Sequence, residues 1–71
     1  MVDAFKRKQL GDSIKAGREK HHFSQQVLAT MIGTSKAHVW RIESGRVGTS
    51  IDTLIAIAGA LDMRVNELIA F

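Results

Sequence analysis

The sequence predicts an all-α fold, and three observations lead to that prediction. Apolar residues recur at spacings of three and four along most of the chain, whereas no segment has the sustained alternation of a strand. Serines stand before several of these apolar runs and glycines after them, as helix caps do. The 71 residues include no proline and are 45% hydrophobic. We therefore expect short helices around one shared core, in a single domain that covers residues 1–71.

The first helix is expected over Ala4–Lys20, with Asp3 as its N-cap. Residues spaced four apart give it one inward face: Leu10, Ile14 and Arg18. Gly11 and Gly17 weaken this helix, by about 1 kcal/mol each relative to alanine. The periodicity breaks after residue 20, where we expect the helix to end.

The next two helices are separated by a glycine turn. One follows Ser24 as its N-cap, covers Gln25–Ile32 and ends at Gly33, because glycine tolerates the left-handed conformation of a helix end. The other covers about residues 35–44, with its first serine as the cap, and stops at Gly45.

Two further helices complete the expected fold. The fourth covers Ile51–Leu61 and is capped by Ser50. Its inward stripe is expected to contain Ile51, Leu54, Ala58 and Leu61. The last helix covers about Val65–Ala70 and presents Leu68 and Ile69 to the core.

The two helices around Gly33 have the side chains that a helix-turn-helix requires. Ala29 is small where the helices approach closely, and Gly33 permits the turn. Val39 and Ile42 are branched apolar residues that lock the second helix against the first. This motif is therefore the strongest functional signal in the chain.

With these residues in register, the sequence resembles the Cro/C1-type (XRE) family of helix-turn-helix DNA-binding domains. The resemblance covers about residues 10–69 and is carried by Leu10, Ile14, Arg18, Ser24 to Ala29, Ile32 to Ser35, Val39 to Gly45, Ser50 to Leu54, Leu61 and Val65 to Leu68. It implies a five-helix lambda-repressor-like bundle that binds operator DNA, usually as a dimer. It also implies a structural ion pair between Arg18 and Glu43 that orients the second helix of the motif.

Four residues depart from the pattern of this family. Val27 stands where the family usually has an acidic residue, and Thr49 replaces a frequent proline. His22 stands at a position that is commonly glycine, so we expect its backbone to be left-handed where the chain leaves the first helix. Arg64 replaces the small polar residue that usually caps the last helix.

The distribution of charge favours a polyanionic partner. Residues 1–46 hold nine Lys or Arg against four Asp or Glu, whereas residues 47–71 hold one Arg against three acidic residues. A basic part joined to a slightly acidic part indicates one face suited to nucleic acid. On charge alone, an ordinary solvated surface remains an equal alternative.

The outward face of the helix at about 35–44 is the expected base-contacting surface. Four residues form it: Lys36, Ala37, His38 and Arg41. Arg41 can pair with O6 and N7 of guanine, and Ala37 can contact a thymine methyl group. Lys36 can reach a guanine or a phosphate.

The expected phosphate contacts lie at the ends of the two motif helices: Ser24, Gln25, Ser35, Trp40, Ser44 and Arg46. Gln25 opens the first motif helix, where free N–H groups also suit a phosphate. Trp40 has several possible roles: packing on the sugar–phosphate backbone, stacking against arginine, touching a thymine methyl group, or covering the Arg46–Thr49 loop.

One recognition helix contacts about four base pairs, which is too few for useful specificity among many competing sites. A homodimer on a two-fold double-stranded DNA operator supplies the missing specificity. The apolar C-terminal part is the expected interface, with Met63, Val65, Ile69 and Phe71 as candidates.

Other classes of function have weaker support. The sequence has no nucleophile elbow or glycine-rich phosphate loop, and its three histidines have no carboxylate at ligand spacing, so we expect no enzyme, metal or cofactor. We expect no membrane segment, no secretory leader and no small-molecule effector, and the lack of cysteine suggests the cytoplasm. A protein-interaction module remains an alternative because of Ala37 and Trp40, and the DNA-binding antitoxin of a toxin–antitoxin pair is a third.

Overall fold

The computed structural model describes residues 4–71 and contains five helices in that part of the chain. In order they are α1 (Ala4–Lys20), α2 (Gln25–Ile32), α3 (Lys36–Glu43), α4 (Ile51–Ala60) and α5 (Val65–Leu68). The residues described include no strand, so the all-α prediction is confirmed. The expected cap Asp3 lies outside the described residues.

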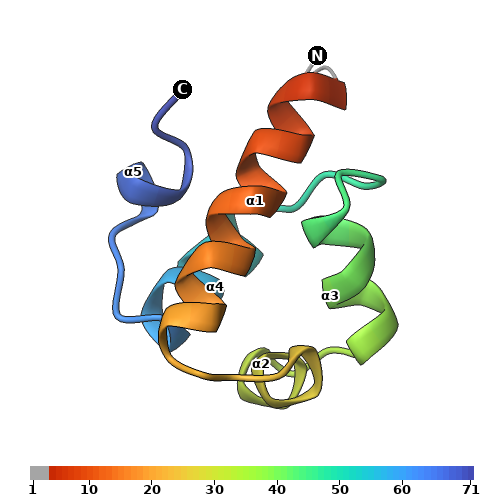
Figure 1. Cartoon of the computed structure of the whole chain (residues 1–71), viewed down its shortest axis with the longest axis vertical. Helices are drawn as coiled ribbons and strands as arrows, with labels where there is room; N and C mark the ends of the chain where they lie inside the picture. Colours follow the sequence, from red (N-terminus) through yellow and green to blue (C-terminus); the bar gives the residue numbers. More distant parts are fainter. Residues whose placement is uncertain (1–3) are drawn as a thin grey trace.

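The long helix α1 runs across the bundle, with α3 against one side and α5 against the other (Figure 1). α2 packs on both α3 and α4, and α5 also contacts α4. One core joins all five helices, and its buried apolar residues are Leu10, Ile14, Leu28, Ala29, Val39, Ile42, Leu54, Ile57, Ala58, Leu61 and Leu68. This core fixes α3 at the edge of the molecule, where its other face is open to solvent.

Three serines cap helices as expected. The hydroxyl oxygens of Ser24, Ser35 and Ser50 each accept a hydrogen bond from the backbone N–H three residues later, at 3.0–3.1 Å. Each such bond satisfies a donor that the first helical turn leaves free. Arg64 has no equivalent oxygen, and at α5 the Glu67 carboxylate accepts from the backbone N–H of Arg64 instead, at 2.9 Å.

Four helices end in the same reversal of the chain. In each, one residue has a positive φ: His22 at 59°, Gly33 at 76°, Gly45 at 76° and Asp62 at 53°. The N–H of that residue and the next N–H bond back to carbonyls of the last helical turn, as in a Schellman motif. The expectation for His22 is confirmed, whereas the positive φ of Asp62 was not expected from the sequence.

Two expectations about the C-terminal helices are wrong. Ile51 is 60% exposed, and Ile57 takes its place in the core. Because a helical Cβ points toward the N-terminus of its helix, the first residue of α4 projects past the end of the core. The last helix ends at Leu68 rather than at residue 70, and Ile69 is 40% exposed.

Two glycines of α1 allow the close packing of helices. A Cβ on Gly11 would lie 2.3 Å from the carbonyl oxygen of Glu43, at the end of α3. A Cβ on Gly17 would lie 2.7 Å from Sδ of Met63. Both glycines therefore do more than weaken α1, because they let it approach α3 and the segment before α5.

Candidate nucleic-acid interface

The helix α3 has a buried side and an open side. Val39 and Ile42 are each only 2% exposed, and they hold α3 against α2 and the core. Lys36, Ala37 and Arg41 are exposed, and His38 is half-buried at the edge of the open side. The structure therefore brings the four expected base-contacting residues onto one accessible stretch of one helix.

The turn between α2 and α3 sets the crossing of the two helices. Gly33 adopts φ 76°, and its N–H donates to the carbonyl of Thr30, while the N–H of Thr34 donates to that of Ala29. Leu28 and Ala29 are fully buried on the side of α2 that meets α3 and α4. After this turn Ser35 caps α3, which begins at Lys36.

The ion pair between Arg18 and Glu43 is present and buried. Nε of Arg18 lies 2.7 Å from Oε2 of Glu43, and Nη2 donates to Oε1 at 3.0 Å. A third nitrogen, Nη1, donates to the carbonyl of Phe23 at 2.7 Å. The hydrogen bond to Glu43 raises the pKa of Arg18 and outweighs burial, which lowers it. The pair joins α1 to the end of α3, as the family resemblance implied.

Gln25 belongs to the same network, which sequence reasoning missed. Its Nε2 donates to Oε1 of Glu43 at 3.1 Å, so α2 is tied to the ion pair between α1 and α3. An amide nitrogen has two protons, so one stays available for another acceptor. The predicted contact between Gln25 and a phosphate is therefore compatible with this bond.

Trp40 and Arg46 stack on each other. The guanidinium carbon of Arg46 lies 5.1 Å from the centroid of the Trp40 ring, and Trp40 is 47% exposed. This contact fits two of the possible roles of Trp40, stacking against arginine and covering the Arg46–Thr49 loop, because Arg46 is the first residue of that loop. Ser44 lies beside this pair as the C-cap of α3, and its hydroxyl donates to the carbonyl of Arg41.

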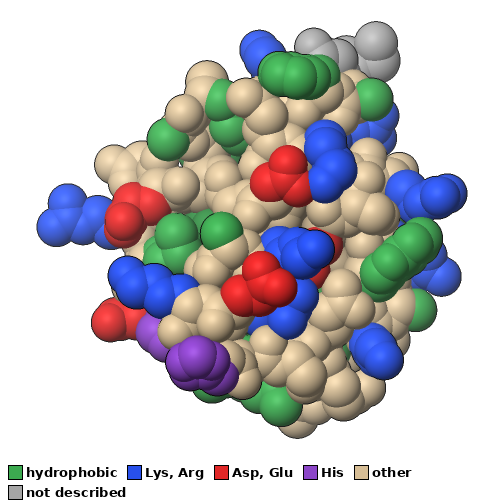
Figure 2. Space-filling view, in the orientation of Figure 1, with side chains coloured by type: hydrophobic (Ala, Val, Ile, Leu, Met, Phe, Trp, Pro, Cys, Tyr) green, Lys and Arg blue, Asp and Glu red, His purple; other side chains and the backbone are tan. Residues whose placement is uncertain are grey.

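Two lysines of α1 extend the basic surface, and sequence reasoning did not single them out. A hollow of about 200 Å³ between α1, α2 and α3 is lined by Lys8, Lys15, Gln25, Trp40, Glu43 and Ser44. Lys8 pairs with Asp12, whereas Lys15 is exposed and has no ion-pair partner among residues 4–71. Figure 2 shows Lys and Arg side chains over α1 and along the side of α3.

The expected dimer residues fall into two groups. Met63 and Val65 are half-buried and pack against the core, whereas Ile69 and Phe71 are exposed. Ile51 and Ile55 are also exposed, on α4. The open apolar surface of the C-terminal part therefore includes two α4 residues that the sequence analysis did not propose for it.

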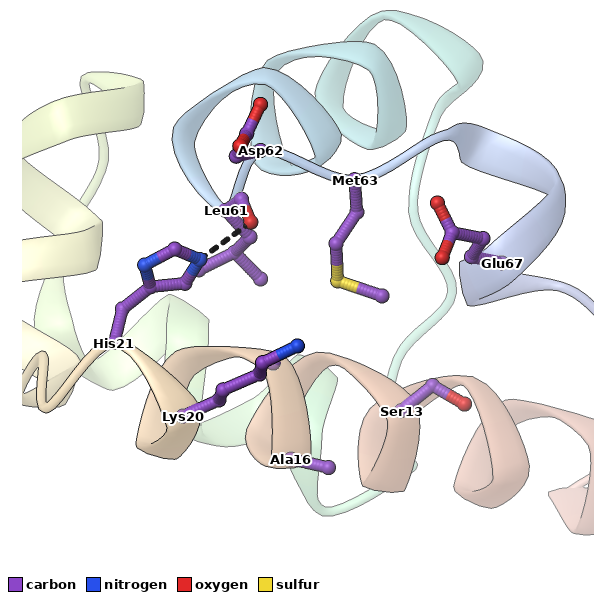
Figure 3. Close-up of a pocket in the computed structure, with 9 residues that line it drawn as sticks. Ser13, Ala16, Lys20, His21, Leu61, Asp62, Met63 and Glu67 are labelled. Atoms are coloured by element: carbon purple, nitrogen blue, oxygen red, sulfur yellow. Dashed lines mark hydrogen bonds between the residues drawn. The ribbon is translucent and has the colours of Figure 1, made fainter.

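A second hollow, of about 560 Å³, lies between α1 and the connection from α4 to α5 (Figure 3). Nε2 of His21 lies 2.6 Å from the carbonyl oxygen of Leu61 and ties the end of α1 to the end of α4. Lys20, Asp62 and Glu67 also line it. Within residues 4–71, no group of three or more His, Cys, Asp or Glu could hold a metal ion. No helix of that part is long and apolar enough to span a bilayer.

Comparison with known proteins agrees with this geometry. A family model described as "Helix-turn-helix" matches residues 14–68. The immunity repressor protein of Bacillus phage phi105 is 35% identical over 60 residues, which cover 84% of this chain and 42% of the repressor. The chain thus spans less than half the length of that relative.

Two solved structures share both fold and sequence with the chain. The restriction-modification controller protein C.AhdI from Aeromonas hydrophila has a TM-score of 0.84 and 27% identity, over 87% of this chain and 94% of that one. The P22 c2 repressor, in complex with a synthetic operator, has a TM-score of 0.80 and 27% identity, over 84% and 91%. With the family match over most of its length, the chain belongs to the Cro/C1-type family of DNA-binding helix-turn-helix transcription regulators.

Proposed function

We propose that the chain is a transcriptional repressor that binds an inverted-repeat operator in double-stranded DNA as a homodimer, with α3 in the major groove. The observation that carries this proposal is the two-sided character of α3. Its inner stripe is locked into the core, while Lys36, Ala37 and Arg41 stand exposed on the other side. A rigid helix with one small apolar and two cationic side chains on its open face fits a major groove.

Each residue of the open face has a proposed role. Arg41 donates two hydrogen bonds to O6 and N7 of a guanine, because its fork matches those acceptors. Lys36 contacts a guanine or a phosphate, and Ala37 contacts a thymine methyl group. His38 flanks them at the edge of the groove. These contacts supply the sequence preference of the protein.

The proposed phosphate contacts position the protein on the duplex. The hydroxyl protons of Ser24 and Ser35 remain available, because in the caps these side chains act as acceptors. Gln25, Ser44, Trp40 and Arg46 complete this set, and Ser44 has to release the carbonyl of Arg41 before its hydroxyl can donate to a phosphate. Such contacts fix register and orientation and contribute equally on any sequence.

Two relatives support the operator and the repressor role. One is named as an immunity repressor of a phage, and another was solved with a synthetic operator. The dimer is proposed because one recognition helix reads too few base pairs for useful specificity. Its interface is the C-terminal part, with Ile69 and Phe71 as the open residues and Met63 and Val65 behind them.

A salt titration tests DNA binding by the wild-type protein. If a dimer neutralises about 6–10 phosphates, the affinity for a duplex falls about 10³–10⁵-fold between 50 and 200 mM salt. Fluorescence anisotropy of a labelled random-sequence duplex measures this slope. An affinity that does not change with salt would contradict the proposal and favour a protein-interaction module.

A paired substitution tests the assignment of the base-contacting face. Arg41→Ala is expected to weaken operator binding by about 1–3 kcal/mol and to relax preference at one base pair per half-site. Gln25→Ala is expected to weaken operator and scrambled DNA by similar factors. It also removes a hydrogen bond of about 1 kcal/mol to Glu43, so its melting temperature falls slightly. An equal loss on both duplexes for Arg41→Ala would assign Arg41 to a phosphate.

A further inference from the structure

The C-terminal end of α3 carries a stacked pair in the free protein. The Arg46 guanidinium lies 5.1 Å from the centroid of the Trp40 ring, which is within the range of cation–π attraction. Both side chains are exposed, so this pair is not part of the core.

The backbone places Arg46 over Trp40. Gly45 adopts φ 76°, its N–H donates to the carbonyl of Ile42, and the N–H of Arg46 donates to that of Arg41 at 3.0 Å. This reversal returns the chain over the last turn of α3. The residue after the left-handed position therefore meets a residue near the end of the helix.

The residue after the left-handed position differs at the other three helix ends, and after α2 it is Thr34, which is polar and half-buried. After α1 it is Phe23 and after α4 it is Met63, and both are half-buried against the core. Such apolar contacts are the usual companions of this motif. At α3 the position holds a cation on a half-exposed aromatic ring, which adds little to the core. The contact between Trp40 and Arg46 thus differs from the apolar contact that usually closes such a helix end.

The surroundings of the pair point to a polyanion. Trp40 precedes Arg41, the main proposed base contact, and lines the hollow that also contains Lys15 and Lys8. Glu43 in the same hollow is neutralised by Arg18. Lys8 is paired with Asp12, so the stacked pair stands at the edge of the proposed DNA surface, next to Arg41 and beside the hollow that contains Lys15.

We infer that Trp40 serves the proposed phosphate contacts as a positioning residue: it holds the guanidinium of Arg46 ready for a phosphate of the DNA backbone and does not contact a phosphate itself. This inference rests on the proposed function. Stacking uses the face of the guanidinium and leaves its N–H edges free to donate to phosphate oxygens. An arginine that is ordered before binding loses less side-chain freedom when it binds. Trp40 then increases affinity without touching a base.

Two substitutions of Trp40 distinguish the contribution of its aromatic ring from that of its apolar bulk. Trp40→Leu keeps an apolar side chain at the helix end but removes the ring, and Trp40→Phe keeps a ring. We expect Trp40→Leu to weaken binding to a random-sequence duplex by about two- to tenfold, and Trp40→Phe to restore most of that loss. Phe5→Leu removes a more exposed aromatic residue of α1 and serves as the control, with unchanged binding. Melting curves check that all variants are folded.

A double-mutant cycle tests whether Trp40 acts through Arg46. Arg46→Ala removes the cation. We expect it to weaken DNA binding and to reduce the slope of log affinity against log salt concentration by about one per protomer. In the Arg46→Ala background, Trp40→Leu is expected to change the affinity by less than about twofold. Equal effects of Trp40→Leu with and without Arg46 would overturn the inference and make Trp40 a direct DNA contact.

The cycle also separates this inference from the proposed function. Additive effects in a protein whose binding retains its steep salt dependence would overturn only the positioning role of Trp40. A wild-type protein without salt-dependent DNA binding would overturn both. If Trp40→Leu also lowers the melting temperature enough to account for its loss of affinity, the contact between Trp40 and Arg46 only stabilises the fold, and the positioning role is overturned.

Discussion

Two non-glycine residues of the described chain adopt a positive φ, which is unfavourable for a residue with a Cβ. Among residues 4–71 only His22 and Asp62 adopt a positive φ without being glycine. Both follow the last turn of a helix and keep the hydrogen bonds of the reversal, with the N–H of Phe23 donating to the carbonyl of Arg18 at 3.1 Å. These hydrogen bonds therefore offset the backbone strain that the Cβ of His22 or Asp62 creates at a positive φ.

The change His22→Gly removes that strain. We expect a gain of about 1 kcal/mol in the free energy of unfolding, which corresponds to several degrees in melting temperature for a domain of this size. His22→Ala is the matched control, because it removes the imidazole and keeps the Cβ. If thermal denaturation gives both variants the same melting temperature, the gain does not come from the backbone.

The sequence allowed His22 to be foreseen but not Asp62, and the reason is physical. At residue 22 the resemblance indicated a position that is commonly glycine. At residue 62 the sequence offered only an acidic residue in a tight connection. Asn and Asp tolerate the left-handed region better than most residues, so they leave no unusual signal there.

At the scale of the helices, the approach of α1 to α3 decides how the recognition helix is held. Gly11 lies against the carbonyl groups of Ile42 and Glu43, at the end of α3. Arg18 reaches Glu43 from about two turns further along α1. A backbone contact and a buried ion pair thus fix the same end of α3, and both depend on the small size of residue 11.

The substitution Gly11→Ala tests this contact. A Cβ would lie 2.3 Å from the Glu43 carbonyl oxygen, so the helices have to move apart. We expect a loss of about 1–3 kcal/mol in unfolding free energy, although alanine is the better helix former. Chemical denaturation measures it.

Gly59→Ala provides the opposite control, because Gly59 is a glycine of α4 with nothing within 4 Å of its Cβ position. There the propensity of alanine acts alone, and a gain of up to about 1 kcal/mol is expected. A stabilised Gly11→Ala protein would contradict the close contact between α1 and α3.

The elements themselves were largely predictable, because their signals are local. The serine caps, the glycine after α2 and the apolar spacing of three and four lie within a few residues of the helices they define. The role of Gly11 was not predictable from spacing, since it depends on the distance to a helix more than thirty residues away. The exposure of Ile51 was missed for a related reason, because periodicity does not say where the core ends along a helix.

For the molecule as a whole, the proposed dimer depends on which apolar side chains of the C-terminal part are open to solvent. The apolar C-terminal segment is the proposed interface, but α5 has only four residues, too few for periodicity to separate inward from outward side chains. The structure makes that separation. Leu68 is fully buried, Met63 and Val65 are half-buried, and Ile69 and Phe71 face solvent.

The change Ile69→Lys tests the dimer. Ile69 is exposed in the single chain, so the substitution is expected to leave the fold intact. In a two-fold dimer each copy brings the same new charge to the interface, and like charges placed together cost several kcal/mol. We therefore expect the dissociation constant of the dimer to be more than about tenfold higher for this variant than for the wild type.

Analytical ultracentrifugation over a concentration series measures this shift, and Met31→Lys is the control. Met31 is 50% exposed on α2, outside the proposed interface, and its change adds the same charge. If association is driven by the C-terminal surface, only Ile69→Lys weakens it, and operator binding then weakens more than binding to random DNA because two half-sites no longer act together. If both variants associate as the wild type does, Ile69 lies outside the interface, and the apolar pair Ile51 and Ile55 on α4 becomes the surface to test next.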